Sequence, residues 1–269
     1  MNDEKQPNVN PTVTAITEIV KSVPIYTDTV QPAAIEVGKA LQTVAKTVNI
    51  ALAPIKALVW GYDQIEEFIN TRVTEKLRNV REDDIVTPSP QLAGPAIEAL
   101  RYTAHENHLR ELFANLIATS MDRNTLNKAH PGYVDIIKNL TPDEAVLLTA
   151  FKSRKSYPLI HASIKRPNLD GTITAMTNFT HIYKEVSLIN HIAMLPSYID
   201  NLSRLGILTS PNGDYLTAPN IYDPLINDDC WIESKEKLAK DGCELVFTKG
   251  VIQLTAYGKH FVENVVIEK

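Results

Sequence analysis

The chain has 269 residues, of which 44% are hydrophobic and 22% are charged, and its formal net charge is −5. The composition is that of a globular protein with a substantial core, and the length suits two domains. The negative charge argues against general coating of nucleic acid, which needs a positive field. Two cysteines without a CxxC pair exclude a disulfide framework. We therefore expect a protein of a reducing, cytoplasmic compartment.

The N-terminal half predicts a polar tail followed by helices. Residues 1–10 are polar, and we expect them to be disordered. Acidic residues stand there where a secretory signal would have a basic start and an apolar centre, so no export signal is predicted. Residues 11–140 show the three-to-four spacing of amphipathic helices and contain few glycines, which predicts an all-helical domain.

The stretch Thr47–Phe68, "TVNIALAPIKALVWGYDQIEEF", is the most apolar passage of the chain. Pro54 predicts a kink, because it removes a backbone donor and clashes with the preceding turn. The stretch has few basic residues and an acidic continuation, whereas helices at a membrane surface carry lysine and arginine. We favour burial in the helical domain over membrane insertion. The residues expected to contact a partner or a membrane are Leu52, Ile55, Leu58, Val59 and Trp60.

Two further helices are predicted after an acidic, proline-rich linker over Arg81–Pro95. Thr103 and Glu106 have the spacing of a capping box, which predicts a short helix before Thr103 and a longer one from about Ala104 to Met121. The apolar residues expected to be buried on the longer helix are Leu109, Leu112, Phe113, Leu116 and Ile117.

A stronger helix start follows at Thr141, with Pro142 at the first helical position and Glu144 at the reciprocal capping position. We place the domain boundary just before it, near Asn139, and predict a winged-helix-like domain over residues 141–269. The predicted strands are "YPLIHASI", "DYLTA" and "CELVFTKGVIQLT", with a helix and short strand in "LPSYIDNLSRLGILTS" and a closing helix that buries Phe261 and Val265. The expected fold class is mainly α, with a smaller α+β part.

The sequence contains few residues at the spacings used for metal binding, catalysis or phosphate binding. His105 and His108 lie one helical turn apart, with Glu111 a turn further on, but the HExxH spacing of a zinc site is absent. There is no GxSxG elbow, and Gly38-Lys39 lacks the upstream glycine of a phosphate loop. We assign no catalytic residue, metal ligand or cofactor. The adjacent acidic pairs are expected at the solvated surface: Glu66-Glu67, Asp83-Asp84 and Asp228-Asp229.

One basic passage stands out from the acidic background. It supplies a candidate patch for an anionic partner: Lys152, Arg154, Lys155, Lys165 and Arg166. In a winged helix, however, the helix that enters the DNA groove would lie near Leu195–Leu205, which offers Asp200 and only Arg204. The basic passage is therefore expected to make a local contact with an anionic protein or nucleic acid, or to serve solubility alone.

Several blocks of the chain together carry a family resemblance. They include "DDIVTPSPQLAGPAIEALRYT", "LRELFANLIATSMD", "KAHPGYVDIIKNLTPDEA", "YIDNLSRLGIL" and "GVIQLTAYGKHFV", besides the apolar stretch above and the residues before it. In this order they resemble the bacterial abortive-infection alpha family. The resemblance implies defence against bacteriophage, in which an infected cell stops growing or dies. It implies no catalytic residue, target or cofactor.

Three hypotheses follow. The first is a non-enzymatic defence protein whose helical domain contacts a protein partner, a phage component or, once activated, the membrane. The second is a winged-helix regulator or sensor that binds nucleic acid through the basic patch. The third is an enzyme whose residues meet only in space, with His105, His108 and Glu111 as its first candidates. We favour the first.

Overall fold

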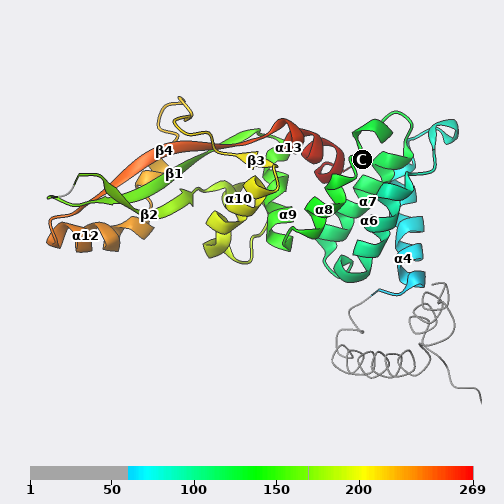
Figure 1. Ribbon diagram of the computed structural model, residues 1–269, viewed down its shortest axis with the longest axis horizontal. Helices are drawn as coiled ribbons and strands as arrows, with labels where there is room; N and C mark the ends of the chain where they lie inside the picture. The colour runs from blue at the N-terminus through cyan, green and yellow to red at the C-terminus, as the bar shows by residue number, and fades with distance from the viewer. Residues whose placement is uncertain (1–59, 169, 269) are drawn as a thin grey trace, which may run out of the picture. The chain divides into compact units, whose positions relative to one another are not determined.

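The computed structural model describes residues 60–168 and 170–268 (Figure 1). The predicted tail over residues 1–10, the first helices and the kink at Pro54 lie outside the described residues. The described chain is mixed α+β, with helices along its length and a four-stranded antiparallel sheet after residue 155. The mixed character agrees with the predicted fold class, whereas the winged-helix arrangement stays a prediction.

The helical part before residue 140 packs around one central helix, α7 (Figure 1). Every residue from Leu112 to Ser120 on α7 is buried, as is typical of a helix surrounded by others. A continuous helix built from α4, a π-helical turn and α5 lies beside it. The helical segments of this part are α4 (Tyr62–Phe68), η1 (Ile69–Val73), α5 (Thr74–Leu77), η2 (Glu82–Asp84), α6 (Pro90–Thr103), α7 (Asn107–Met121), η3 (Leu126–Lys128) and α8 (Gly132–Lys138).

The predicted apolar face of α7 is confirmed, but its predicted start is wrong. All five residues expected in the core are buried. Thr103 does not cap α7, because it is the last residue of α6 and its hydroxyl donates to the Ala99 carbonyl at 2.9 Å. A threonine inside a helix commonly bonds back one turn in this way. Helix α7 therefore begins at Asn107, and Glu106 at its N-cap makes no side-chain capping bond.

The predicted linker over Arg81–Pro95 is wrong in its second half, since α6 begins at Pro90 and contains Pro95. Its first half is held against the end of α7 by an antiparallel bridge between Ile85 and Asp122. Asp84, expected at the solvated surface, is only 8% exposed and accepts a hydrogen bond from Arg81 Nε at 2.9 Å. The linker is thus an ordered connection between α5 and α6.

The predicted helix start at Thr141 is confirmed. Helix α9 (Pro142–Leu148) has Pro142 at its first position, and the Thr141 hydroxyl accepts from the Glu144 amide at 3.2 Å. The Glu144 carboxylate in turn accepts from the Thr141 amide at 2.7 Å. These reciprocal bonds satisfy two amides that would otherwise lack helical partners. Helix α9 continues into η4 (Thr149–Lys152).

The sheet has the strand order β2-β1-β4-β3. Strands β1 and β4 form the long central ladder, which runs from Ser156↔Gln253 to Lys165↔Glu244. The prediction missed β2, whose first six residues are all exposed, and the predicted strand "DYLTA" is irregular chain. The predicted strands at β1, β3 and β4 are confirmed. The strands are β1 (Ser156–Lys165), β2 (Thr172–Phe179), β3 (Leu208–Thr209) and β4 (Glu244–Leu254).

Helical segments connect the strands, and a last helix follows strand β4. Helix α10 (Leu195–Arg204) occupies the predicted position and is terminated by Gly206 two residues after its end, where a φ of 74° suits a residue without a Cβ. The closing helix joins α13 (Ala256–Phe261) to the π-helical turn η8 (Val262–Val266), and it buries Phe261 and Val265 as predicted. The remaining segments are η5 (Ile182–Glu185), η6 (Ile192–Met194), α11 (Asp223–Ile226), η7 (Asp229–Trp231) and α12 (Ile232–Lys240).

The closing helix is anchored to α7 by polar side chains as well as by apolar packing. Asn115 Nδ2 donates to the Val265 carbonyl at 2.8 Å, and the Thr119 hydroxyl donates to the Asn264 carbonyl at 2.9 Å. A helix end leaves carbonyls without helical partners, and these donors satisfy two of them. The C-terminal turn is thereby fixed in the helical part.

Two apolar clusters support the described chain. The larger runs from Ile65 to Val266 and includes residues on both sides of position 140. The smaller joins Ile160 and Ala162 of β1 to Tyr222, Leu225 and Trp231 on one face of the sheet. The division into domains 11–140 and 141–269 stays a prediction. No helix in the described residues has the length and apolar character needed to cross a membrane.

Candidate functional site

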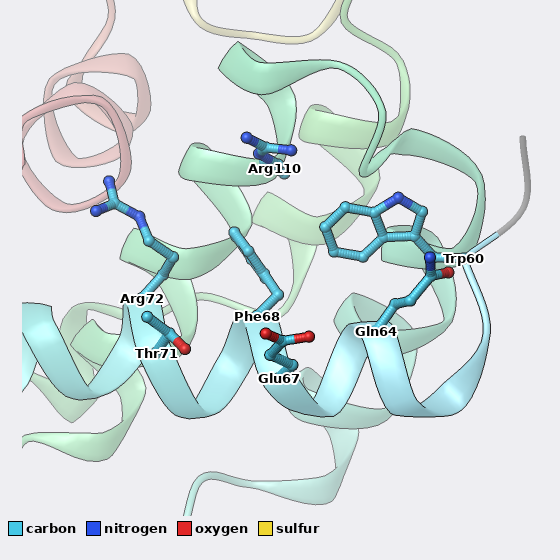
Figure 2. Close-up of a pocket in the computed structure, with 7 residues that line it drawn as sticks. All are labelled: Trp60, Gln64, Glu67, Phe68, Thr71, Arg72 and Arg110. Carbon is cyan, nitrogen blue, oxygen red and sulfur yellow. The ribbon is translucent and has the colours of Figure 1, made fainter.

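A pocket of about 360 Å³ opens on the helical part, between the continuous helix α4–η1–α5, here called the first helix, and the start of α7 (Figure 2). Trp60 and Phe68 form one wall, and Arg110 reaches over from α7. Gln64, Glu67 and Thr71 are exposed side chains of the first helix that border the pocket. This volume is within the usual range of small-molecule and side-chain binding sites.

The aromatic wall is held by local contacts. The Trp60 and Phe68 rings meet edge to face with centroids 5.6 Å apart. The Trp60 amide donates to the Arg101 carbonyl at 3.0 Å, which ties this part of the chain to the end of α6. Phe68 is buried while Trp60 is half-buried, so the indole lies where core packing gives way to the pocket.

Arg110 is the charged group of the pocket. Its guanidinium carbon lies 5.8 Å from the ring centroids of both Trp60 and Phe68. One terminal nitrogen donates to the Ala104 carbonyl at 3.2 Å. Its Nε is buried and has no hydrogen-bond partner among the described residues. An unpaired buried donor is costly, so a small movement of the Arg110 side chain toward an acceptor brought by a ligand would be favoured here.

A network of ion pairs fixes the helix beside the pocket. Arg72 donates to both Glu111 carboxylate oxygens at 2.9 Å and also contacts Glu75. The Lys76 amine, with a side chain only 2% exposed, lies 3.1 Å from Glu111 and 3.3 Å from Glu268. Burial raises the pKa of Glu111, but hydrogen bonds from Arg72 and Lys76 outweigh it and hold the pKa below its usual range.

The predicted histidine cluster does not assemble with Glu111. His105 and His108 are exposed, and His105 Nε2 lies 3.6 Å from Glu106. Glu111 is engaged by the two cations of the first helix. Among residues 60–168 and 170–268, no three His, Cys, Asp or Glu side chains come together as a metal site.

The predicted basic patch falls into two groups. All five side chains are exposed. Lys152, Arg154 and Lys155 precede β1, whereas Lys165 and Arg166 stand at its far end. Because a strand rises about 3.3 Å per residue, the ten-residue strand separates the groups by roughly 30 Å. The structure therefore does not bring the five residues together.

The predicted partner helix is described only at its end. Leu52, Ile55, Leu58 and Val59 lie outside the described residues. Trp60 packs against the larger apolar cluster and forms the wall of the pocket. Glu66 and Glu67, expected at the surface, are exposed as predicted.

A buried carboxylate that the sequence did not reveal organises the region around α10. Asp143 on α9 accepts from the amides of Asn190 and His191 at 3.0 and 2.9 Å and from the Tyr198 hydroxyl at 3.0 Å. Burial raises the pKa of Asp143, but these hydrogen bonds outweigh it and lower the pKa overall. The carboxylate thereby fixes the start of α10 against α9.

Asp228 is a second carboxylate that is held by hydrogen bonds; its side chain is 24% exposed, so its predicted place on the solvated surface is only partly correct. It accepts from the Cys230 amide at 2.9 Å and lies 2.7 Å from His181 Nε2. Desolvation and the Asp228 carboxylate raise the pKa of the Cys230 thiol to about 12. The thiol is thus protonated at neutral pH, which does not suit a nucleophile.

Sequence reasoning missed Arg110, Lys76 and the Asp143 network, because each depends on contacts between distant segments. A basic residue inside an amphipathic helix is ordinarily a solvated one. The sequence signal at Lys76 and Arg110 was a basic residue within an otherwise apolar helical pattern.

Comparison with known proteins identifies the chain at the family level. No curated protein matches it. A solved structure of an uncharacterized protein from the hydrocarbon-degrading marine bacterium Alcanivorax borkumensis SK2 is similar with a TM-score of 0.33 at 14% identity, covering 48% of this chain and 87% of the other. The family described as abortive infection alpha matches residues 61–265, which points to an abortive-infection-type defence role. As this match spans about three quarters of the sequence, the chain belongs to the abortive infection alpha family.

Proposed function

We propose that this protein acts in abortive infection as a non-enzymatic binding protein, and that the pocket around Trp60 contacts a protein partner or a phage component. The carrying observation is the buried, unpaired Nε of Arg110 beside the Trp60 and Phe68 rings. Tryptophan and arginine are the residue types that most often dominate the energy of protein interfaces.

The pocket defines the chemistry of its partner. An apolar or aromatic side chain would pack on the Trp60 ring, and an adjacent carbonyl or carboxylate oxygen would accept from Arg110. Glu67 at the border would disfavour a densely anionic group such as a polyphosphate. A peptide or protein segment that combines an apolar side chain with one acceptor fits best.

Site-specific photo-crosslinking in infected cells tests this contact. A photoreactive residue at Thr71, which borders the pocket, is compared with one at the neighbouring exposed position Asn70, which does not line it. We expect a discrete crosslinked species from position 71 and little from position 70. Equal yields at both positions, or none at either during infection, would contradict the proposed binding site.

In a membrane version of this proposal, the apolar segment before Trp60 inserts into the bilayer during infection. Its motivation is the apolar run that ends at Trp60, a residue type common at membrane interfaces. Entry of a membrane-impermeant dye into infected cells that express the protein is the matching measurement. Membranes that stay intact while protection persists would rule this version out.

A second candidate function is nucleic-acid binding by a winged-helix-like domain. Its support is that α9, β1, α10, β3, β4 and α13 follow in this order once β2, α11 and α12 are set aside, and that β1, β4 and β3 are neighbours in the sheet. Exposed Lys152, Arg154 and Lys155 beside β1 would supply phosphate contacts. On α10, however, Arg204 is bonded to Asn201 at 2.7 Å and Asp200 accepts from Asn178 at 2.8 Å, which leaves few donors for bases.

Salt-dependent binding to duplex DNA separates this candidate from the first. If it holds, replacing Lys152, Arg154 and Lys155 by Glu weakens binding and reduces the salt dependence, while the same change at Lys165 and Arg166 has a separate, additive effect. Binding without salt dependence, or unaffected by the triple change, would remove its basis.

A further inference from the structure

Three polar side chains meet just after the end of strand β2. His181 Nε2 lies 2.7 Å from Asp228 Oδ2, and His181 Nδ1 lies 3.2 Å from the Lys184 amine. A lysine ammonium can only donate, so Nδ1 accepts from Lys184. Nε2 then carries the imidazole proton and donates it to the Asp228 carboxylate. The side chains are therefore joined in the order amine, imidazole, carboxylate.

Local structure places the amine next to the imidazole. His181 is the N-cap of the 3₁₀ turn η5, and the Lys184 amide donates to the His181 carbonyl at 2.9 Å. In a 3₁₀ turn, side chains three residues apart lie one above the other. The turn is anchored by Ile182, which is 1% exposed and whose amide donates to the Thr180 hydroxyl at 3.3 Å. Lys184 itself is exposed, so molecules in solution can reach its amine.

The imidazole is held in one orientation by contacts from both sides. Asp228 comes from a distant segment, and its carboxylate also accepts from the Cys230 amide at 2.9 Å. The rings of Phe179 and Tyr183 meet the imidazole edge to face, with centroids 5.5 and 5.8 Å away. The His181 side chain is only 15% exposed. The ring is thus fixed between the carboxylate and the amine.

We propose that Lys184 is a modification site for activated acyl groups, with His181 as the general base and Asp228 as the residue that orients the base. A nucleophile, a base and an orienting group within hydrogen-bond reach of one another form the arrangement that activates a nucleophile. Among residues 60–168 and 170–268, no other lysine amine lies within hydrogen-bond distance of a histidine nitrogen. The site is separate from the pocket and does not depend on its function.

The modification is an acyl transfer to nitrogen. The Lys184 ammonium loses one proton to solvent, and the lone pair of the resulting amine attacks the acyl carbon. As the carbon–nitrogen bond forms, the nitrogen gives a second proton to His181 Nδ1. The leaving group departs with the electron pair of its bond to carbon and takes this proton from the imidazolium. The products are an uncharged amide on Lys184 and the protonated leaving group.

The neighbouring thiol does not compete with this amine. Cys230 is exposed, but desolvation and the Asp228 carboxylate raise the pKa of its thiol to about 12. A thiol that stays protonated at neutral pH is a poor nucleophile. Acylation is therefore expected on Lys184 rather than on Cys230.

The test is the rate of acetylation of each lysine in the folded full chain, measured by peptide mass spectrometry after brief exposure to p-nitrophenyl acetate. Lys184 is expected to react about tenfold faster than Lys155, an exposed lysine of the same chain, because only Lys184 has a base beside its amine. In concentrated urea, where the contact with His181 is lost, the two lysines should react at similar rates.

His181→Gln is the sharpest variant, because the glutamine amide can still donate to Asp228 but has no base in place of Nδ1. It is expected to lower the rate at Lys184 to that of Lys155 and to leave Lys155 unchanged. Asp228→Asn removes the orienting charge and should also slow Lys184. Circular dichroism checks that both variants are folded. Equal rates at Lys184 and Lys155 in the wild type overturn the proposal, and so does a fast Lys184 that both variants leave unchanged.

Discussion

The helical part and the sheet part of this protein stabilise their buried charges in different ways. Around α7, the Lys76 amine is buried between the carboxylates Glu111 and Glu268, so charge is balanced by charge. Around α10, the Asp143 carboxylate is held chiefly by neutral backbone amides and the Tyr198 hydroxyl. In the helical part, Lys76 is thus paired with carboxylates, whereas the Nε of Arg110 at the pocket is buried and has no hydrogen-bond partner among the described residues.

The largest effect is expected from the shared core. Phe113 on α7 is fully buried, and Phe113→Ala should lower the free energy of unfolding by about 3–5 kcal/mol. The two tryptophans, Trp60 and Trp231, report separately on the helical part and on the sheet part. When Phe113→Ala is introduced into the Trp60→Phe or the Trp231→Phe background, one tryptophan remains as the fluorescence reporter of unfolding. In denaturant titrations, the unfolding transitions of both reporters should shift to lower denaturant concentration together. A Trp231 transition left in place would show that the two parts unfold independently.

The packing of the closing helix against the chain just before β3 is tested at Gly258. A Cβ there would lie 2.1 Å from the Ile207 carbonyl oxygen, and backbone cannot move aside as a flexible side chain can. Gly258→Ala is expected to lower stability by about 3 kcal/mol. At Gly94 in α6, an added Cβ meets nothing within 4 Å, so Gly94→Ala should stabilise by about 0.5–1 kcal/mol. Thermal unfolding of both variants measures the difference, and equal effects would contradict the close approach.

Asp143 makes the stability of the sheet part depend on pH. Its folded-state pKa is lowered, so its stabilisation is complete above the unfolded value of about 3.9 and is lost as the pH falls through the folded value. Asp143→Asn should lower stability by about 2 kcal/mol at pH 7 and reduce the loss below about pH 4. Asp135→Asn, at an 80% exposed side chain, should change stability little. Urea titrations at pH 7 and at lower pH measure the free energy of unfolding of each variant. If the loss of stability in acid is the same for Asp143→Asn as for the wild type, Asp143 does not have this role.

The smallest expected difference in stability is between variants of the two predicted capping boxes, of which only the one at Thr141 is formed. Thr141→Ala removes a formed cap and should lower stability by about 1 kcal/mol. Thr103→Ala removes only a bond back to Ala99 within α6, so the expected loss is a few tenths of a kcal/mol. Thermal melts under identical conditions make the comparison, and equal losses would indicate that Thr103 also caps a helix.

The sequence predicted what depends on local pattern and missed what depends on distant pairs. The apolar spacing of α7 and the Thr141–Glu144 signature are local, and both were correct. The Thr103 signature is equally local, but α6 continues through Thr103 and takes its hydroxyl.

The sequence prediction missed β2: residues 172–175 alternate polar and apolar types, but the first six residues are all exposed and form no buried face. The candidate site was visible only in part. Trp60 stood out as an aromatic end to an apolar run, whereas the unpaired Arg110 Nε depends on how α7 meets the first helix. The basic residues are close in sequence, but an extended strand carries them apart.

The central claim is that the pocket around Trp60 acts in defence, and phage plating on cells that express the protein tests it most directly. Thr71→Arg places a large cation at the border of the pocket, and Asn70→Arg adds the same charge at the next position, outside the lining. With matched expression, we predict that Thr71→Arg abolishes protection while Asn70→Arg retains it. Full protection by Thr71→Arg, or equal loss in both variants, would contradict the account.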